Sequence, residues 1–215
     1  MLDAKAGSKV TAITMGVGLP RDVAKKPVAM GADQLVILED PAFEGGDSWS
    51  TAYALAMAIK KIGPFDLIFC GRQAADWDAG QVGAGIAEIL GIPSVTVAKK
   101  IEVEDGMAVV ERVVADGFEV LETALPALIT VTNELGEARF ATLKGIMGAA
   151  KKQPTVWKAA DIGADASKIG AAGRHTKLLK LFQPVKVGKC EVIGGENVAD
   201  AAVKLALRLR EAKVI

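Results

Sequence analysis

The sequence has few cysteines and few aromatic residues. Among 215 residues it contains 2 cysteines, Cys70 and Cys190, and 5% of the residues are aromatic. Two cysteines far apart in sequence, without a Cys-x-x-Cys or Cys/His grouping, exclude a disulfide framework and indicate neither a zinc site nor a nucleophile. We therefore predict no metal and a reducing compartment, the cytoplasm.

An excess of charge of one sign is also absent, because 26 Lys and Arg residues balance 26 Asp and Glu residues. Without a positive field, and with few aromatic rings to stack on bases, the composition argues against nucleic-acid binding. No apolar run approaches the length that spans a bilayer, so we expect no direct membrane insertion. What is present is 51% hydrophobic residues and 23 glycines, a balance typical of α/β domains.

Apolar runs alternate with helical patterns in the first half of the chain. Buried strands are predicted over 10–15, 34–38 and 67–70, and helices over 49–62 and 80–90. Pro27 predicts a short or kinked helix within 21–30. Because strands that alternate with helices need crossover connections, the predicted fold class is α/β, with a mainly parallel sheet and helices on both faces.

After Pro93 the pattern becomes that of a β-hairpin region. Strands are predicted over 95–104, 107–114, 118–123 and 127–132. Asp105-Gly106 and Asp116-Gly117 are the turn signals between the first three. Residues 155–195 have little periodicity and predict an extended arm, in which 175–184 would pack on a partner, and a final helix is predicted over 196–212.

The strand at 67–70 leads into a loop rich in small residues that opens a helix. Ligands of parallel α/β sheets collect at the carboxyl ends of strands, and a helix N-terminus offers unpaired N–H groups to a phosphate. Glycines for close approach, one cation and two amides are available there: Gly71, Gly80, Gly83, Arg72, Gln73 and Gln81. The loop is neither Gly-x-Gly-x-x-Gly nor a P-loop, and an ordinary tight connection explains the pattern equally well.

For three other motifs, the residues alone favour a structural role over a functional one. Asp76 and Asp78 suit capping and loop solvation better than a metal site. The sequence GGDS at 45–48 is similar to the pyrophosphate loop of ATP pyrophosphatases, but an N-cap for the next helix is favoured. Leu143, with cations around it, has the setting of an exposed anchor for a partner, whereas a core leucine at a helix start is the better reading from residue types alone.

Two stretches are similar to the β subunits of electron-transfer flavoproteins. One runs from GGDSWSTAYALA to CGRQAADWDAGQVG, and the other is VTNELGEARFATLKGIMGAAKK. The likeness covers nearly the whole chain. It implies a heterodimer with an α subunit, whose FAD, held mostly by that subunit, carries electrons from acyl-CoA-type or other flavin dehydrogenases to a downstream acceptor. No side chain of this subunit would be catalytic.

The resemblance also assigns sites. It implies a nucleotide, AMP or a second FAD, at Met15, Gly71, Arg72, Gln73, Ala74, Asp76, Asp78, Gly80, Gln81, Val82 and Gly83. It implies that Leu143, with Arg139 and Lys144, docks into a dehydrogenase, which reverses the core reading of that leucine. Residues 1–154 would be the nucleotide-binding α/β domain, and residues 155–215 an arm and helix that pack on the partner subunit.

Within the family, GGDSWSTAYALA and QVGAGIAEILGIP are closer to members that hold a second FAD and bifurcate electrons from NADH. In such a member the chain would be an oxidoreductase component. The sequence joins the family pattern after its first strand and most of its first helix. We therefore expect an N-terminally truncated reading, a gap with unpaired backbone groups beside 10–15, and weakened nucleotide binding.

Two alternatives from other classes stay open. One is an ATP-using enzyme of the pyrophosphatase type, acting through GGDS and Arg72. The other is a small nucleotide-sensing or scaffold domain that acts alone, against which the long arm argues.

Overall fold

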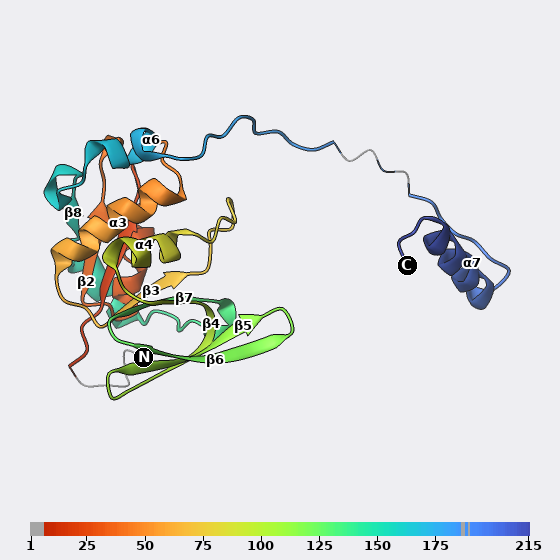
Figure 1. Cartoon of the computed structure of the whole chain (residues 1–215), viewed down its shortest axis with the longest axis horizontal. Coiled ribbons are helices and arrows are strands. Elements are labelled where there is room, and N and C mark those ends of the chain that lie inside the picture. Colours follow the sequence, from red (N-terminus) through yellow and green to blue (C-terminus); the bar gives the residue numbers. More distant parts are fainter. Residues whose placement is uncertain (1–6, 186–187, 189) are drawn as a thin grey trace. The chain divides into compact units, whose positions relative to one another are not determined.

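The expected buried strands pair in parallel, but they form two sheets rather than one. The computed structural model describes residues 7–185, 188 and 190–215, and Figure 1 shows its elements. One sheet has the order β1-β2-β8 and is parallel throughout. The other has the order β3-β7-β4-β5-β6, in which β3, β7 and β4 are parallel and β4, β5 and β6 are antiparallel. The predicted α/β class is thus confirmed.

Where the sequence predicted the range of a strand or a helix, the observed bounds agree closely with it. The strands are β1 (Thr11–Met15), β2 (Gln34–Leu38), β3 (Leu67–Gly71), β4 (Ser94–Glu104), β5 (Met107–Val114), β6 (Gly117–Ala124), β7 (Ala127–Val131) and β8 (Thr155–Trp157). The α-helices are α1 (Arg21–Ala24), α2 (Lys26–Ala29), α3 (Ser48–Ile62), α4 (Val82–Leu90), α5 (Leu143–Lys151), α6 (Gly170–Gly173) and α7 (Val198–Glu211). The 3-10 helices are η1 (Pro41–Phe43), η2 (Asn133–Leu135), η3 (Ala160–Ile162) and η4 (Ala166–Lys168).

Two local predictions from turn chemistry are confirmed. Pro27 breaks the helical pattern into α1 and α2 and lies in the first turn of α2, where its missing N–H is not needed. Asp105 and Gly106 both have positive φ, 49° and 78°, as the tight turn between β4 and β5 requires. Both features follow from one or two residues and need no distant partner.

Helix α3 lies between the two sheets and packs on both. Ala54 and Ala58 face a cluster with β1 and β2, while Ala52 and Ala56 face a cluster with α4, β3 and β7. Helices α2 and α5 cover the other face of the first sheet, so that sheet has helices on both faces. Among the described residues β1 pairs with β2 only and β3 with β7 only, so each is an edge strand of its sheet, and β8 and β6 are the opposite edges.

The prediction that residues 155–195 form an extended arm is wrong for the first part of that range. The chain divides into two compact units, residues 1–177 and 178–215, so the boundary does not fall at 154. Strand β8 pairs with β2, and Ile162 and Ile169 are buried against Leu38 and Phe43. A strand of three residues and isolated apolar anchors leave no periodic pattern, which is why the sequence did not show them. Residues 1–6, and 186, 187 and 189 of the predicted arm, lie outside the described residues.

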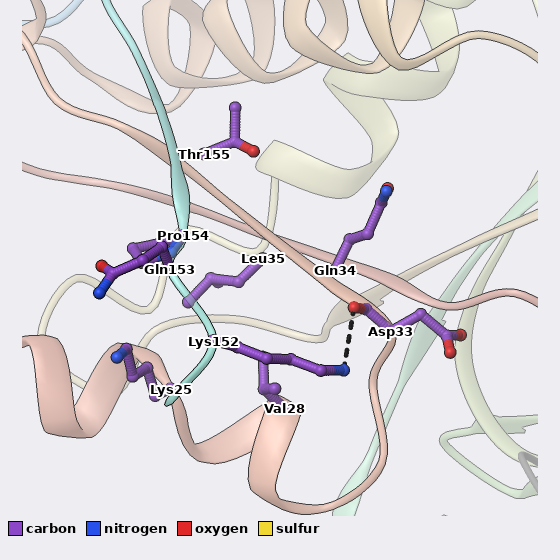
Figure 2. A pocket seen from close by; sticks show the side chains of 9 residues that line it. All are labelled: Lys25, Val28, Asp33, Gln34, Leu35, Lys152, Gln153, Pro154 and Thr155. Atoms are coloured by element: carbon purple, nitrogen blue, oxygen red, sulfur yellow. Dashed lines mark hydrogen bonds between the residues drawn. The ribbon is translucent and has the colours of Figure 1, made fainter. Parts of the chain in front are cut away.

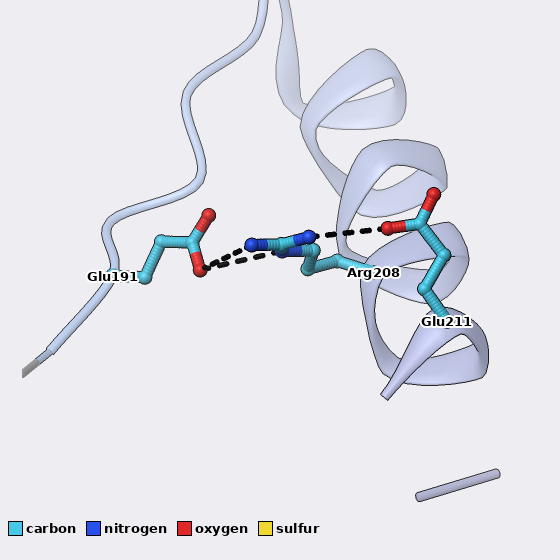
Figure 3. Close-up of polar contacts among 3 residues, drawn as sticks. All are labelled: Glu191, Arg208 and Glu211. Atoms are coloured by element: carbon cyan, nitrogen blue, oxygen red, sulfur yellow. Dashed lines mark hydrogen bonds and ion pairs between the residues drawn. The ribbon is translucent and has the colours of Figure 1, made fainter. Parts of the chain in front are cut away.

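The unit 178–215 is built around α7, the predicted final helix. Asn197 caps it by accepting a hydrogen bond from the Asp200 N–H at 3.0 Å. Arg208 bridges Glu191, in the segment before the helix, and Glu211, in its last turn (Figure 3). No side chain of α7 is buried. The unit is therefore held by capping and surface ion pairs rather than by a core.

Candidate functional site

Most of the predicted site residues from Gly71 onward lie in the exposed loop 72–81 between β3 and α4, whereas Gly71 ends β3 and Val82 and Gly83 begin α4. The Arg72 N–H donates to Val131 O at 3.0 Å, which extends the ladder between β3 and β7 by one bond. The loop then folds on itself, because Gln73 Nε2 donates to Asp78 Oδ1 at 2.7 Å and the Asp78 N–H donates to Ala74 O at 3.0 Å. Asp78 thus braces the loop, and it takes one of the two amide hydrogens that we had expected Gln73 to offer to a ligand.

Three glycines along this connection have different structural roles. A Cβ on Gly71 would meet no atom within 4 Å, so the backbone there faces open space. Gly80 has φ +62°, a conformation that favours glycine. A Cβ on Gly83 would lie 2.6 Å from Thr130 Cγ2, so this glycine lets the first turn of α4 press onto β7. The connection therefore packs closely on β7 at Gly83 and leaves the backbone open at Gly71.

The N-terminus of α4 carries no cap from its own N-cap side chain. Gln81 precedes the helix in a helical conformation, and its side chain makes no capping hydrogen bond. The first N–H groups of a helix have no partner within the helix and carry partial positive charge. Together with the open backbone at Gly71, this end of α4 offers main-chain donors of the kind that can hold an anionic group.

The GGDS motif is organised differently, as a capped helix start. Asp47 Oδ1 accepts hydrogen bonds from the N–H groups of Trp49 and Ser50, each at 3.1 Å. Ser50 Oγ in turn accepts from the Asp47 N–H at 2.9 Å, which completes a capping box. The predicted N-cap is confirmed. These amides are saturated by the chain's own carboxylate, so they are not a pyrophosphate cradle.

The Asp47 carboxylate stays charged although its partial burial opposes ionisation. Partial burial raises its pKa, but hydrogen bonds from the backbone of Ser50, Thr176 and His175 and from the Thr176 hydroxyl outweigh burial. The pKa of Asp47 is therefore held well below its usual range.

The remaining predicted nucleotide residues lie in the loop, in α4 and at the end of β1. Arg72, Ala74 and Asp76 are exposed in the loop, and the partly buried Val82 packs on the cluster between α3 and α4. Met15 ends β1 in the other sheet, where its partly buried side chain packs on the cluster of α3 and β2. The structure thus gathers the residues from Gly71 to Gly83 and places Met15 at the end of a strand of the adjoining sheet.

Sequence reasoning missed Thr130, which supports the loop from below. Its side chain is 2% exposed, and its Oγ1 accepts a hydrogen bond from the Val97 N–H at 2.9 Å. Val97 has φ 64°, rare for a β-branched residue, at a register shift between β4 and β7. The only sequence signal was a hydroxyl within the apolar run ALITV.

Cys70 pairs with Thr130 near the end of β3 and is a partly buried thiol. A Cβ on Gly83 would lie 3.4 Å from the Cys70 Cβ, so α4 covers this residue. Burial raises the pKa of the Cys70 thiol, which keeps it protonated at neutral pH. The expectation that Cys70 is not a nucleophile agrees with this environment.

The predicted docking residues lie on or beside α5. Phe140 is 98% and Leu143 75% exposed, and Ile146 and Met147 are also exposed. We call these four apolar residues the Leu143 patch. The opposite side of α5 packs on α2 through Gly145 and Ala149.

The reading of Leu143 as a core residue is therefore wrong, and its exposure suits an anchor. Of the two cations predicted beside it, Lys144 is exposed, and Arg139 Nη2 donates to Met30 O at 3.2 Å. The guanidinium is thus partly engaged within this chain.

A separate pocket contains none of the predicted residues. Figure 2 shows it between α2, β2 and the segment before β8, lined by Lys25, Val28, Asp33, Gln34, Leu35, Lys152, Gln153, Pro154 and Thr155. Its two ammonium groups donate to main-chain oxygens, Lys25 to Ala150 at 3.1 Å and Lys152 to Asp33 at 3.2 Å. These lysines tie the pocket walls together. Among the described residues, none of the helices combines the length and the apolar character that a membrane span requires.

Comparison with known proteins agrees with this architecture. The family described as "Electron transfer flavoprotein domain" matches residues 1–162. A caffeyl-CoA reductase-Etf complex subunit, CarD, of Acetobacterium woodii is 38% identical over 99% of this chain and 81% of its own length. Electron transfer flavoprotein β subunits are 40% identical in Thermoanaerobacterium thermosaccharolyticum, over 98% of this chain and 81% of theirs, and 41% in Megasphaera elsdenii, over 85% and 70%.

The fold and the loop after β3 define an α/β protein with parallel sheets and a candidate ligand loop at a strand end. The family match and the relatives narrow that class. The chain belongs to the electron transfer flavoprotein family and, within it, to the β subunits, whose work is electron transfer.

Proposed function

We propose that this chain is the β subunit of a heterodimeric electron-transfer flavoprotein of the cytoplasm and that it holds an adenine nucleotide at the loop from Gly71 to Gly83. The observation that carries the proposal is the open backbone at Gly71 beside the uncapped start of α4. FAD, shared with the α subunit, would accept and release the electrons. The part of this chain is to bind and to orient, and none of its side chains acts in catalysis.

Each loop residue has a stated part in this proposal. Main-chain donors at the start of α4 hold the phosphates, with the Arg72 guanidinium adding positive charge. Asp78 and Gln73 keep the loop in shape through their 2.7 Å hydrogen bond. Thr130 and Gly83 hold α4 against the sheet so that its first turn stays in place.

The partner surfaces follow from exposed apolar side chains. Residues 178–215 pack on the α subunit, for which Leu179, Leu181, Phe182 and Val185 provide exposed apolar side chains. The Leu143 patch docks with an acyl-CoA-type or another flavin dehydrogenase, and a downstream acceptor takes the electrons. Both surfaces consist of large apolar side chains that are exposed to water until a partner covers them.

A second candidate is a bifurcating electron-transfer flavoprotein that uses NADH and holds a second FAD in place of AMP. The 38% identity to a subunit of a caffeyl-CoA reductase-Etf complex favours it. The same main-chain donors suit either the phosphate of AMP or the diphosphate of FAD.

The first experiment counts nucleotides. The chain is co-expressed with an α subunit of the family, the complex is purified and denatured, and released FAD and AMP are quantified per heterodimer. One FAD with one AMP supports the electron shuttle, whereas two FAD without AMP support the second candidate. A complex that releases no nucleotide beyond the shared FAD overturns the proposed site.

Gly71→Ala tests the position of the ligand. Because an added methyl meets open space in the protein, the free energy of unfolding is expected to change by less than about 0.5 kcal/mol. A ligand seated against this backbone would collide with the methyl, so nucleotide affinity is expected to fall about tenfold or more, or about 1.4 kcal/mol. Gly148→Ala is the matched control, because a Cβ there also meets nothing within 4 Å. Equal affinities for both variants would remove Gly71 from the site.

A further inference from the structure

The Asp47 carboxylate joins two segments that lie far apart in the sequence. Its Oδ1 caps α3, whereas its Oδ2 accepts hydrogen bonds from the N–H groups of His175, at 2.7 Å, and Thr176, at 2.9 Å. The Thr176 hydroxyl donates to the same oxygen at 3.1 Å. His175 is 128 positions from Asp47 in the chain. The helix cap uses only Oδ1, so Oδ2 is free to accept hydrogen bonds from His175 and Thr176, near the end of the first unit.

The neighbours of Asp47 in the GGDSW motif reinforce this contact. A Cβ on Gly45 would lie 3.3 Å from Ala171 Cβ, and one on Gly46 would lie 3.4 Å from Gly170 Cα, so both glycines admit α6 at close range. The ring of Trp49 stacks on that of His175, with centroids 5.4 Å apart and planes 19° apart.

Arg174 adds a further contact, because its Nη1 donates to Gly45 O at 3.5 Å. Except for Ser48, every residue of GGDSW therefore faces residues 170–176. We call Gly45–Trp49 the arm clamp.

We propose that the arm clamp, with Asp47 as its positioning residue, fixes the chain at residues 174–176 and thereby preorganises the unit 178–215 for the partner subunit. The partner in this inference rests on the proposed function. Three donors on one carboxylate oxygen form charge-assisted hydrogen bonds, which are about twice as strong as neutral ones. A chain held at its point of departure loses less conformational entropy when it binds, so its affinity is higher.

Helix capping alone predicts something different, and two variants separate the two roles. Asp47→Ser keeps an N-cap, because serine caps about as well as aspartate, but it removes Oδ2. Ser50→Ala removes the reciprocal bond of the capping box and leaves Oδ2 and its donors in place. The first variant should release the end of the unit, and the second should weaken the start of α3.

The clamp is measured by amide hydrogen exchange on the full chain. In Asp47→Ser the amides of 174–177 are expected to exchange about tenfold faster or more, while the centre of α3 stays protected. Trypsin should cut after Arg174 and Lys177 sooner. In Ser50→Ala, exchange is expected to rise in the first turn of α3 and not at 174–177.

A conservative pair at Thr176 provides the rescue test. Thr176→Ser keeps the hydroxyl donor and is expected to behave as wild type, whereas Thr176→Val is expected to exchange faster at 174–177. Unchanged exchange at 174–177 in both Asp47→Ser and Thr176→Val would overturn the clamp.

Partner binding tests the consequence. The wild-type chain and each variant are titrated with the α subunit, and Asp47→Ser is expected to bind about tenfold more weakly while Ser50→Ala binds as wild type. If Asp47→Ser opens the clamp but binds equally well, the positioning role is overturned. If the wild-type chain does not bind an α subunit at all, the proposed function fails instead, and hydrogen exchange alone decides on the clamp.

Discussion

The exposed position of Leu143 agrees with the anchor role that the family resemblance implies. It begins α5, is 75% exposed, and shares the Leu143 patch with a fully exposed phenylalanine, Phe140. On the opposite side of the helix, Gly145 and Ala149 face α2. These small residues let the backbone of α5 approach α2 closely, and the large apolar side chains point away from it. An apolar side chain of this size in water is typical of an anchor at a protein interface.

We predict that Leu143→Ala weakens coupling to a dehydrogenase by about 2 kcal/mol, the cost of losing a central anchor. Bound flavin and thermal stability should not change, because the side chain contributes little to the core. The measurement is the rate of electron transfer from the dehydrogenase at increasing concentrations of the complex. Val120→Ala, at another exposed apolar position, on β6, is the control. Unaltered kinetics in Leu143→Ala would remove this residue from the docking role.

At the residue scale, the sequence predicts what a residue does to its near neighbours. The cap at Asp47, the turn at Asp105-Gly106 and the break at Pro27 all follow from local stereochemistry. The second oxygen of Asp47 does not, since its donors lie 128 and 129 positions away. Nothing local marks Thr130 either, because its acceptor role depends on a bulge in a neighbouring strand.

At the scale of elements, β4 is the strand that changes the character of the second sheet. It pairs in parallel with β7 from Ser94 to Ala98 and in antiparallel with β5 from Ala98 to Glu104, and each of the two ladders has a register shift next to Ala98. The change passes through Val97, whose left-handed backbone costs about 1–3 kcal/mol. Thr130 holds the bulge from β7, and the Thr132 N–H donates to Ala98 O at 3.1 Å just beyond it.

Thr130→Val is predicted to destabilise the protein by about 1–3 kcal/mol, the cost of leaving a buried N–H, that of Val97, without its acceptor. The substitution keeps the shape of the side chain, so packing under Gly83 is preserved. Thr130→Ser is the matched variant: it keeps the acceptor and loses one methyl, for about 1 kcal/mol. Chemical denaturation of both variants measures the difference. A valine variant as stable as the serine variant would show that the hydroxyl does not hold the bulge.

Prediction of elements succeeded where an element is long enough to repeat its pattern. Helix α3 shows its apolar positions over four turns, and β2 is a continuous apolar run, so both were found within a residue of their bounds. Strand β8 has three residues and α6 is a run of glycine and alanine, so neither has a period. The open edges of β1 and β3 depend on which strands meet, and that information is not local.

At the scale of the molecule, the two units differ in what holds them together. The hydrophobic clusters lie within the first unit, with Ile162 and Ile169 among their members from the C-terminal side. From residue 178 on, none of the described residues is buried. The unit 178–215 thus contributes binding surface, and the unit 1–177 contributes the core.

We predict that a chain ending at Lys177 unfolds within about 2–4 °C of the full chain, a shift that corresponds to about 1 kcal/mol for a domain of this size. It keeps β8, both buried isoleucines and the arm clamp, so its core is complete. A chain ending at Pro154 is the contrasting variant, and it should lose several kcal/mol, because each isoleucine contributes about 1.5–3 kcal/mol on burial. Thermal unfolding followed by circular dichroism compares the two. The chain ending at Lys177 should also fail to bind the α subunit, because the apolar side chains from Leu179 to Val185 are removed. If it instead melts as early as the chain ending at Pro154, then residues 178–215 stabilise the first unit, and the core of unit 1–177 is not sufficient by itself.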